Sequence, residues 1–446
     1  MGSVAPMLTK LWTPPFFMAC LAALLAPGSV SAQAELPPTF EFSFSNPGAR
    51  SMGFGGAFAA LADDATAAFA NPAGLVQLVD PEVSIEGRYW SYSTPYVSGG
   101  RIFGPPTGIG EDFTAGLRMG SSDQDMTGLS FLSFVYPRRR WSVAFYRHLL
   151  SNYEFDATTD GLYSGPWPDT GLVRREFAYD RSADIQIISS AIAGAYEVTE
   201  TFSLGMAINY FEGNIDLVTD VYGKIRSDTP PEEFFAPVPI VPENLFYTAS
   251  LLIADRDWGL SLGIHWQPTR AWSFGAFFRE GPKFDTVAEL RAGPTFVDPA
   301  MSGEVIESET ASTRFPTVYG LGASCRLGEG RVTLSFEWDH VAYSSIFSGD
   351  DELHINDANE LHLGGEYAFL QTVPIVSLRA GVWLDPDHQI SYNGTNYVAE
   401  AVLGSGDDHV HFAAGLGLAF NRFQLDLAAD LSELVDTVSL SVIYSF

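Results

Sequence analysis

The sequence has few cysteines, few basic residues and no long apolar segment after its start. Its two cysteines are Cys20 and Cys325, and Cys20 lies in an N-terminal leader, so we expect no intrachain disulfide in the mature chain. Lysine and arginine total 24, against 54 aspartates and glutamates. We do not expect a nucleic-acid partner, because the net negative charge of the chain would repel a polyanion.

The first 34 residues have the layout of a secretory signal peptide. Lys10 is their only charged residue, the apolar run "FFMACLAALLAPGSV" follows it, and the small residues "SAQA" come next. This run is shorter than the ~20 residues that a membrane-spanning helix needs. We therefore expect residues 1–34 to be removed on export.

Aromatic residues are abundant in the rest of the chain. The sequence has 33 Phe, 18 Tyr and 9 Trp, and no later segment offers a long apolar helix. Only helices and closed β-barrels satisfy every backbone polar group in lipid. An exported, aromatic-rich chain without spanning helices therefore favours a transmembrane β-barrel.

The last ten residues, "TVSLSVIYSF", show the alternation that a barrel wall requires. Val438, Leu440, Val442 and Tyr444 share one face, and threonine and serine occupy most of the other. Comparable segments recur along the chain, and we expect about fourteen strands, an even number as in bacterial single-chain barrels. They lie near 82–92, 127–137, 141–156, 184–199, 202–223, 246–267, 272–293, 315–327, 331–346, 360–370, 375–386, 409–420, 423–433 and 437–446.

The connections between these strands alternate in length, except at the last hairpin. Short turns at one rim and long loops at the other are typical of outer-membrane barrels. The predicted fold class is therefore all-β, a transmembrane antiparallel barrel of about fourteen strands. The acidic long loops are interpreted as solvated, or as bridged through divalent cations to the outer-membrane lipid and lipopolysaccharide. The long loops span 93–126, 157–183, 224–245, 294–314, 347–359 and 387–408.

A compact segment, "GARSMGFGGAFAALADDATAAFANPAGL" (residues 48–75), precedes the first expected strand. It has too many glycines for one long helix and too little alternation for a strand. A barrel of fourteen strands has a lumen wider than the eight-strand size that side chains fill unaided. We therefore expect this segment to plug the lumen.

Local signals in this segment predict tight turns and one short helix. Glycines from Gly53 to Gly56 permit turns that other residues resist. Asp63 or Asp64 is expected to cap a helix that ends at Phe69 or Ala70, before Pro72.

The segment resembles the N-terminal hatch of the FadL-type outer-membrane transporters, which carry long-chain fatty acids and other hydrophobic compounds. The resemblance rests on the glycine-rich start, the "ADDA" step and the "NPA" step. "FPTVYGLGASCRLGEGRVTLSFEWDHVAYS" (315–344) is similar to late strands of that family. The resemblance implies a signal peptide (1–34), a hatch (35–80) and a barrel (81–446). It assigns to the hatch Gly53, Gly55, Gly56, Asp63, Asp64, Asn71, Pro72, Ala73 and Gly74.

The resemblance also implies a passive uptake route for a hydrophobic small molecule. The cargo would adsorb at the long loops, pass the hatch and leave through a wall opening or below. Loop 224–245 is apolar and proline-rich, which suits the first step. Its candidate ligand-binding residues are Phe234, Phe235, Ile240 and Leu245.

Two arginines are candidates for binding the carboxylate of a fatty acid. Arg279 and Arg379 are expected to face the lumen, although each could instead pair with an acid such as Asp385. The acidic loops favour a neutral hydrocarbon over an anionic cargo.

Two other functions are weighed as alternatives. "GFGGAF" followed by "NPAGL" also resembles barrels that belong to a protein secretion or attachment system. A barrel of that kind would bind a protein partner. "GLSLG" (259–263) matches the G-x-S-x-G pattern of a lipid hydrolase. Because it lies within an alternating strand rather than a strand-to-helix turn, Ser261 is not expected to be a nucleophile, and no enzyme activity is predicted.

Lumen-facing charges offer no clear metal or catalytic motif in the sequence. His409 and His411 share a strand face beside acids, which is interpreted as polar lumen lining rather than a metal site. The acids expected in the lumen are interpreted as mutually paired, so no metal or cofactor is predicted. They are Glu337, Asp339, Asp426 and Asp430.

Overall fold

The computed structural model describes most of the chain from residue 45 onward. The predicted signal peptide, Phe234 and Phe235 lie outside the described residues. Within the described part, no helix is long and apolar enough to cross a bilayer. The described residues are 45–108, 112–165, 174–175, 178–223, 239–296, 299–349, 352–395, 397, 400, 403 and 406–446.

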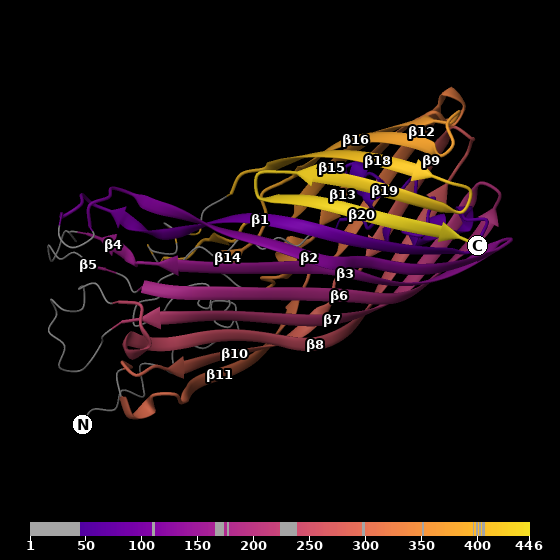
Figure 1. Ribbon diagram of the computed structural model, residues 1–446. Coiled ribbons are helices and arrows are strands. Elements are labelled where there is room, and N and C mark those ends of the chain that lie inside the picture. The colour runs from indigo at the N-terminus through magenta and orange to yellow at the C-terminus, as the bar shows by residue number, and fades with distance from the viewer. Residues whose placement is uncertain are drawn as a thin grey trace.

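The strands form one closed antiparallel wall (Figure 1). β1 (Glu82–Phe103) pairs with β2 (Leu117–Arg138) on one side and with β20 (Val435–Ser445) on the other, which closes the barrel. The remaining wall strands are β3 (Trp141–Thr159), β6 (Ala178–Thr199), β7 (Phe202–Tyr222), β8 (Leu245–Trp266), β9 (Trp272–Arg279), β10 (Lys283–Ala292), β11 (Val305–Arg314), β12 (Val318–Leu327), β13 (Val332–Val341), β15 (Ala358–Phe369), β16 (Ile375–Asp385), β18 (His409–Ala419) and β19 (Phe423–Leu431).

Two wall strands are interrupted at prolines. Pro282 separates β9 from β10, and Pro316 separates β11 from β12, because proline has no N–H to continue the ladder. The sheet has 18 strands when every piece is counted. With each interrupted strand counted once, and with the short β4 (Leu162–Ser164) and β5 (Arg174–Arg175) set aside, the wall has the fourteen strands that the sequence predicts.

Four expectations about loops are wrong. Residues 157–159 and 178–183 belong to β3 and β6 rather than to a loop. Residues 305–314 form β11 rather than a loop and pair with β10. β1 and β2 continue through residues 93–103 and 117–126. Leu245 begins β8 rather than belonging to a loop. These stretches are strand extensions rich in polar residues, such as "VIESETASTR" in β11, and therefore lack visible alternation.

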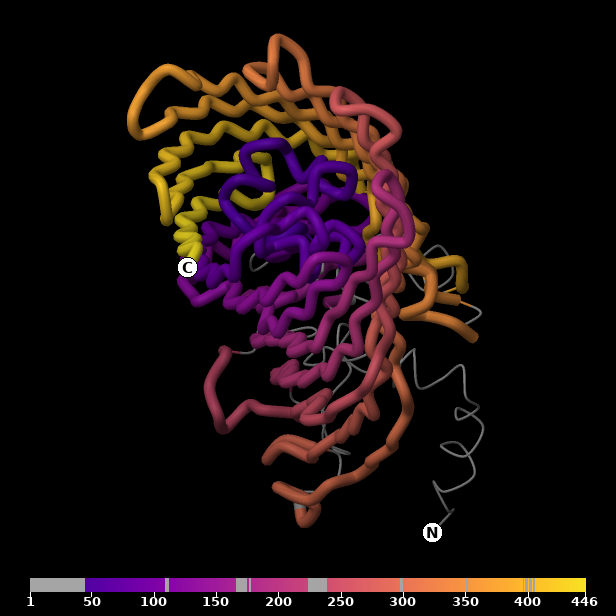
Figure 2. The backbone as a smooth tube through the Cα atoms, turned by 90° about the vertical axis from the view of Figure 1, so that its right-hand side faces the viewer, coloured from indigo at the N-terminus to yellow at the C-terminus, as the bar shows by residue number. Residues whose placement is uncertain are grey.

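The remaining elements are short. A luminal segment, defined as residues 45–78, contains α3 (Ala49–Gly53), α4 (Ala67–Ala70) and the 3₁₀ helix η1 (Pro72–Gln77). Figure 2 shows it inside the ring of strands, seen from the end where the short turns and the C-terminus lie. The others are the two-stranded sheet β14 (Leu353–His354) with β17 (Ser391–Tyr392), and the 3₁₀ helices η2 (Pro242–Asn244), η3 (Pro299–Met301), η4 (Gly328–Gly330) and η5 (Tyr343–Ser345).

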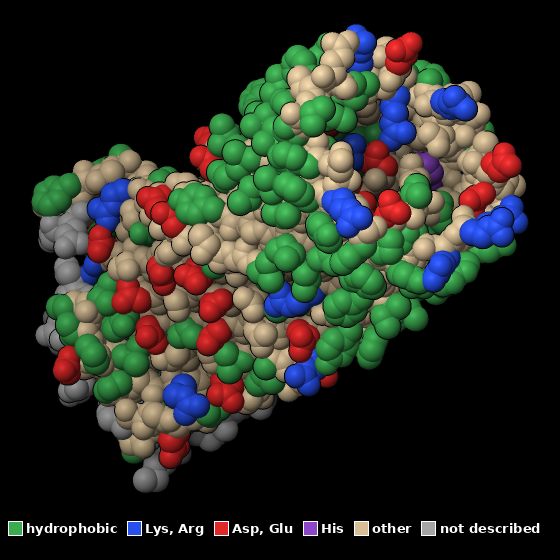
Figure 3. Space-filling model, turned by 45° about the vertical axis from the view of Figure 1, so that its right-hand side comes forward, with side chains coloured by type: hydrophobic (Ala, Val, Ile, Leu, Met, Phe, Trp, Pro, Cys, Tyr) green, Lys and Arg blue, Asp and Glu red, His purple; other side chains and the backbone are tan. Residues whose placement is uncertain are grey.

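The polarity of the wall reverses along the strands. In the part of β7 near the short turns, Leu204, Met206 and Ile208 face outward and Asn209 is buried inside. Beyond Tyr210 the outward residues are polar, whereas Phe211 and other apolar residues are buried inside. The outer apolar belt therefore covers the short-turn part of the barrel, while Asp and Glu gather over the other part (Figure 3).

Aromatic side chains mark both edges of this belt. Tyr210 contacts Trp258, with ring centroids 4.9 Å apart, where the polarity changes. Near the short turns, Phe274 stacks between Trp266 and Trp272. Trp258 and Trp266 are eight residues apart on β8, which at the usual strand rise and tilt is about 20 Å along the barrel axis. This height is close to the ~25 Å apolar band of outer-membrane barrels.

One prediction tests which stretch of wall contacts lipid. Met206→Arg should destabilise the barrel by about 2–4 kcal/mol, because it places a cation within the apolar belt. Asn214→Arg, outward on the same strand but beyond Tyr210, should change the free energy of unfolding by less than about 0.5 kcal/mol. Urea unfolding of both variants in lipid vesicles measures this. Equal costs for the two substitutions would contradict the assigned belt.

Candidate functional site

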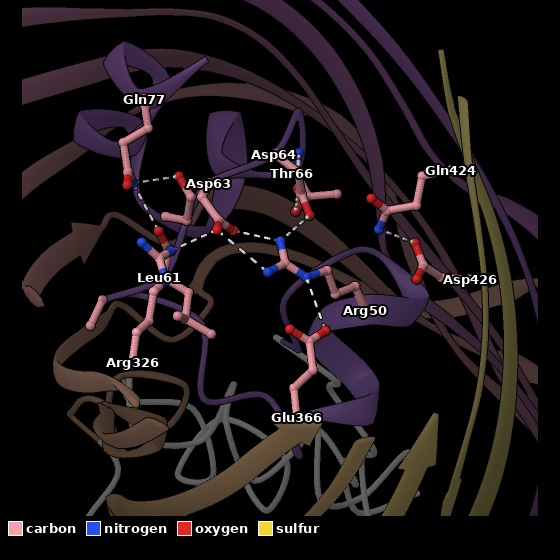
Figure 4. Close-up of polar contacts among 12 residues, drawn as sticks. Arg50, Leu61, Asp63, Asp64, Thr66, Gln77, Arg326, Glu366, Gln424 and Asp426 are labelled. Carbon is pink, nitrogen blue, oxygen red and sulfur yellow. Dashed lines mark hydrogen bonds and ion pairs between the residues drawn. The ribbon is translucent and has the colours of Figure 1, made fainter. Parts of the chain in front are cut away.

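The luminal segment is held to the wall by a charged network around Asp63. Arg50 on α3 contacts Asp63 at 2.5 Å (Nη1 to Oδ1), and Arg326 from the wall contacts the other oxygen at 2.8 Å (Nη2 to Oδ2). Arg50 also lies 3.4 Å from Asp64 and 3.8 Å from Glu366 of β15 (Figure 4). The "ADDA" step thus contacts β12 directly through Arg326 and β15 through Arg50.

Neither Asp63 nor Asp64 is the N-cap of the short helix, contrary to the expectation; the N-cap is Thr66, whose side chain makes no capping hydrogen bond. Asp64 Oδ1 instead accepts hydrogen bonds from the backbone N–H and the hydroxyl of Thr66, just before α4. The expected end of the helix at Ala70 is confirmed.

The "NPA" step anchors the segment a second time. Asn71 Nδ2 donates to the carbonyls of Ala59 (2.9 Å) and of Ile264 in β8 (3.0 Å). Its Oδ1 accepts from the Ala73 N–H at 3.2 Å and caps η1, which Pro72 begins. Ser203 of β7 donates to the Ala73 carbonyl at 2.9 Å.

Glycines let the luminal segment lie against the wall backbone. A Cβ on Gly275 would lie 2.1 Å from the Ala59 oxygen, and one on Gly364 would lie 2.2 Å from the Phe54 oxygen. Within the segment, Gly55 and Gly56 have φ of 62° and 85°, which glycine adopts without strain. A Cβ on Gly74 would lie 2.2 Å from the Ala62 oxygen, whereas Gly53 faces Arg379 and Gly415.

The two candidate arginines are buried, and each already contacts other residues of the protein. Arg379 contacts Glu366 at 2.7 Å and Asp426 at 2.6 Å, and the expected partner Asp385 is not among the acids it contacts. Arg279 donates to Asn46 Oδ1 at 2.9 Å, and its guanidinium lies 4.4 Å from the ring centroid of Phe69. A fatty acid carboxylate would have to displace these partners.

The lumen beyond the luminal segment has two chemically different sides. On β3, β6, β7, β8 and β10 the inward side chains are buried and mostly apolar, with polar exceptions such as Arg181, Thr219 and Thr286. On β13, β15, β16 and β18 they are polar or charged, including Asp339, His362 and His411. The apolar side consists of residues such as Tyr153, Phe155, Ile185, Ile187, Phe211, Ile215, Leu217, Leu251, Ile253 and Phe284.

The sequence-predicted pairing of luminal acids is found for some acids. Asp426 pairs with Arg379, and Glu337 accepts a hydrogen bond from the Ala59 N–H at 2.6 Å. Asp430 contacts His411 at 3.2 Å and accepts from the Trp383 indole at 2.8 Å. His409 lies 3.9 Å from Glu433, so the two histidines contact different acids.

Ser261 has the surroundings of a structural residue. It lies inside β8, as predicted, and its hydroxyl accepts a hydrogen bond from Asn209 Nδ2 at 2.9 Å. A strand interior lacks the sharp turn that exposes a hydrolase nucleophile.

Backbone pairing between β2 and β3 is missing over a long stretch. β2 and β3 pair only between Phe131↔His148 and Arg138↔Trp141, although both strands continue toward the long loops. A bulge at residue 150 of β3 coincides with the start of this gap. Among the described contacts, side chains bridge it, as from Gln124 Nε2 to Asp156 Oδ2 at 3.0 Å, and the Asp156 N–H donates to the Ser122 hydroxyl at 2.9 Å. The sequence gives no signal for this gap, because it depends on strand register.

An ion pair fixes the first long loop, which joins β1 to β2. Arg101 of β1 contacts Asp112 through two nitrogens, and both residues are buried. Thr107 donates to the same carboxylate through its N–H (3.0 Å) and hydroxyl (2.7 Å). Burial alone would raise the pKa of Asp112, but hydrogen bonds from Arg101 and Thr107 outweigh it and hold the pKa below its usual value.

A closed wall of fourteen strands around a folded N-terminal segment defines a transmembrane β-barrel with an occupied lumen. No protein-family model and no curated protein sequence matches the chain. Its fold is that of the FadL-type outer-membrane transporters, as the sequence resemblance predicts.

Three solved structures illustrate this likeness. A Pseudomonas aeruginosa FadL homologue has a TM-score of 0.61 at 15% identity, covering 93% of this chain and 100% of that one. The Ralstonia pickettii toluene transporter TbuX has a TM-score of 0.55 at 13% identity, covering 91% and 100%. The CymD monoaromatic hydrocarbon channel has a TM-score of 0.53 at 17% identity, covering 91% and 99%.

A second prediction tests whether wall glycines seat the luminal segment. Gly275→Leu should push the segment off the wall, because a Cβ there would overlap the Ala59 carbonyl. Ion conductance in planar bilayers should rise. Gly194→Leu is the matched control, since the nearest atom to a Cβ there is the Ser142 oxygen at 3.7 Å. Unchanged conductance in folded Gly275→Leu protein would contradict a lumen sealed by this segment.

Proposed function

We propose that this protein is a passive channel for hydrophobic small molecules in the outer membrane of a Gram-negative bacterium, with the luminal segment as its hatch. The observation that carries the proposal is the apolar side of the lumen, which lies between the long loops and the luminal segment. The hydrocarbon and toluene transporters of the same fold support this assignment.

The proposed route runs from the long loops into the apolar side of the lumen and out through the gap between β2 and β3. Cargo would meet apolar side chains such as Tyr153 and Phe155 on β3, the strand that borders this gap. Passage through the gap requires no break in a backbone ladder, since none is formed there. The gap begins beside Phe131 and His148, at the edge of the apolar belt, so cargo would reach lipid at this end of the gap without crossing the luminal segment.

The proposed cargo class is neutral, such as an aromatic or aliphatic hydrocarbon. Arg279 and Arg379, the cations proposed for a carboxylate, already have protein partners. Outward acids such as Asp156, Asp184 and Asp216 surround the loop end of the barrel and would repel an anion. Loop 224–245 remains the proposed first contact, with half-buried Ile240 at the edge of its described part.

A third prediction concerns cargo choice. A strain that lacks the gene should take up labelled toluene more slowly than the complemented strain, because the channel offers the apolar path. Labelled long-chain fatty acid should show a smaller difference. Equal toluene uptake with and without the gene would count against transport, and recovery of a stoichiometric protein partner would then favour the secretion-system alternative.

A fourth prediction tests the gap as the exit. Gln124→Cys with Asp156→Cys, in a Cys325→Ser background, places two thiols across the gap for a short thiol cross-linker. Cross-linking should lower hydrocarbon uptake, and reduction should restore it. The control pair, Asn214→Cys with Ala254→Cys, lies across the closed β7–β8 ladder and should leave uptake unchanged. If both pairs behave alike, the gap is not the exit.

A further inference from the structure

Three luminal side chains with metal-ligand chemistry lie together on β13 and β15. Asp339 and Glu360 are cross-strand partners, and His362 follows two residues later on the same face of β15. One ligand atom from each lies within 4.8 Å of the others. Like charges directly opposite one another destabilise a sheet unless something compensates them.

The hydrogen bond of His362 fixes which ring nitrogen can bind a cation. Nδ1 lies 2.7 Å from the carbonyl oxygen of Gly55 in the luminal segment. Because a carbonyl only accepts, Nδ1 must carry the proton and Nε2 presents a lone pair when the ring is neutral. Nε2 faces two carboxylates, Glu360 Oε2 at 3.3 Å and Asp339 Oδ2 at 4.0 Å.

The carboxylate of Asp339 is buried, and one of its two oxygens lacks a hydrogen-bond partner within the described part of the chain. Its residue is 7% exposed, and Oδ1 has no hydrogen-bond partner among the described residues. Arg279 acts electrostatically on this carboxylate, and one of its nitrogens donates to Asn46. A buried carboxylate without a partner is costly, so this arrangement calls for a cation.

We propose that Asp339, Glu360 and Nε2 of His362 bind one divalent transition-metal ion of the zinc type. One imidazole nitrogen and two carboxylate oxygens suit such an ion, and a backbone carbonyl on the other ring nitrogen is the usual orienting partner of a metal-bound histidine. Through the bond from His362 to Gly55, the ion fastens the luminal segment to the wall.

The site is reachable from the lumen. Asp339, Glu360 and His362 line a pocket together with Asn46 of the luminal segment and Trp90 of β1. The ring of Trp383 stacks on His362 at 5.2 Å and limits the orientations of the imidazole. An ion bound by three side chains keeps coordination positions open toward this pocket.

Zinc titration of the full-length protein, purified in detergent without a histidine tag and stripped with a chelator, tests the proposal. Wild-type protein should bind one Zn²⁺ per chain at this site by calorimetry. Asp339→Asn should weaken that binding by at least roughly tenfold. Asp357→Asn, which alters a histidine–carboxylate pair with His340 elsewhere, is the matched control and should bind as wild type. Circular dichroism and heat-modified gel mobility confirm that each variant is folded.

A second measurement does not depend on any variant. Anomalous scattering at the zinc edge from crystals of the wild-type protein should place an ion about 2.0–2.2 Å from His362 Nε2 and from a carboxylate oxygen. Zn²⁺ affinity unchanged by Asp339→Asn, or no ion at these atoms, would overturn the proposal. In that case a protonated His362 would compensate the negative charges of Asp339 and Glu360.

Discussion

The whole structure depends on one constraint, that no backbone N–H or C=O may face lipid without a hydrogen-bond partner. A sheet meets it only by closing on itself, and β1 does so by pairing with both β2 and β20. Closure with fourteen strands produces a lumen that side chains alone do not fill. The folded N-terminal segment fills part of that lumen.

The outside of the wall contacts lipid along one part of the strands and water along the other, which explains why the polarity of its outer face reverses. Within the belt, lipid requires apolar residues outside, and the inward side faces the polar contacts of the luminal segment. Beyond Tyr210 and Trp258, water covers the outside, and the interior becomes the apolar side. The long strands β3, β6, β7 and β8 carry most of the buried apolar side chains beyond the belt, so these strand extensions form the apolar side of the lumen.

The sequence predicts the parts of the fold that lipid controls. The alternation at Val438, Leu440 and Val442 predicts β20, because the bilayer allows only apolar residues on that face. β11 escapes prediction because it lies where both faces tolerate polar residues. The glycine-rich, "ADDA" and "NPA" steps point to a luminal segment, yet the partners of Asp63 and Arg379 depend on register. A shift of one residue would bring a different acid to Arg379, and no single sequence fixes this.

A cargo could leave either by displacing the luminal segment or by opening the gap between β2 and β3. The contacts at each place indicate which exit has the lower free-energy cost. Displacing the segment would break buried contacts at Arg50, Asn71 and Glu337, and each unsatisfied buried polar group costs roughly 1–3 kcal/mol or more. Opening the gap between β2 and β3 separates exposed side chains such as Gln124 and Asp156, which water can satisfy at once. Exposed contacts of this kind contribute about 0–1 kcal/mol. The lower cost favours a route through the wall while the luminal segment stays in place. The tightly anchored segment and the weakly closed gap therefore favour the same exit.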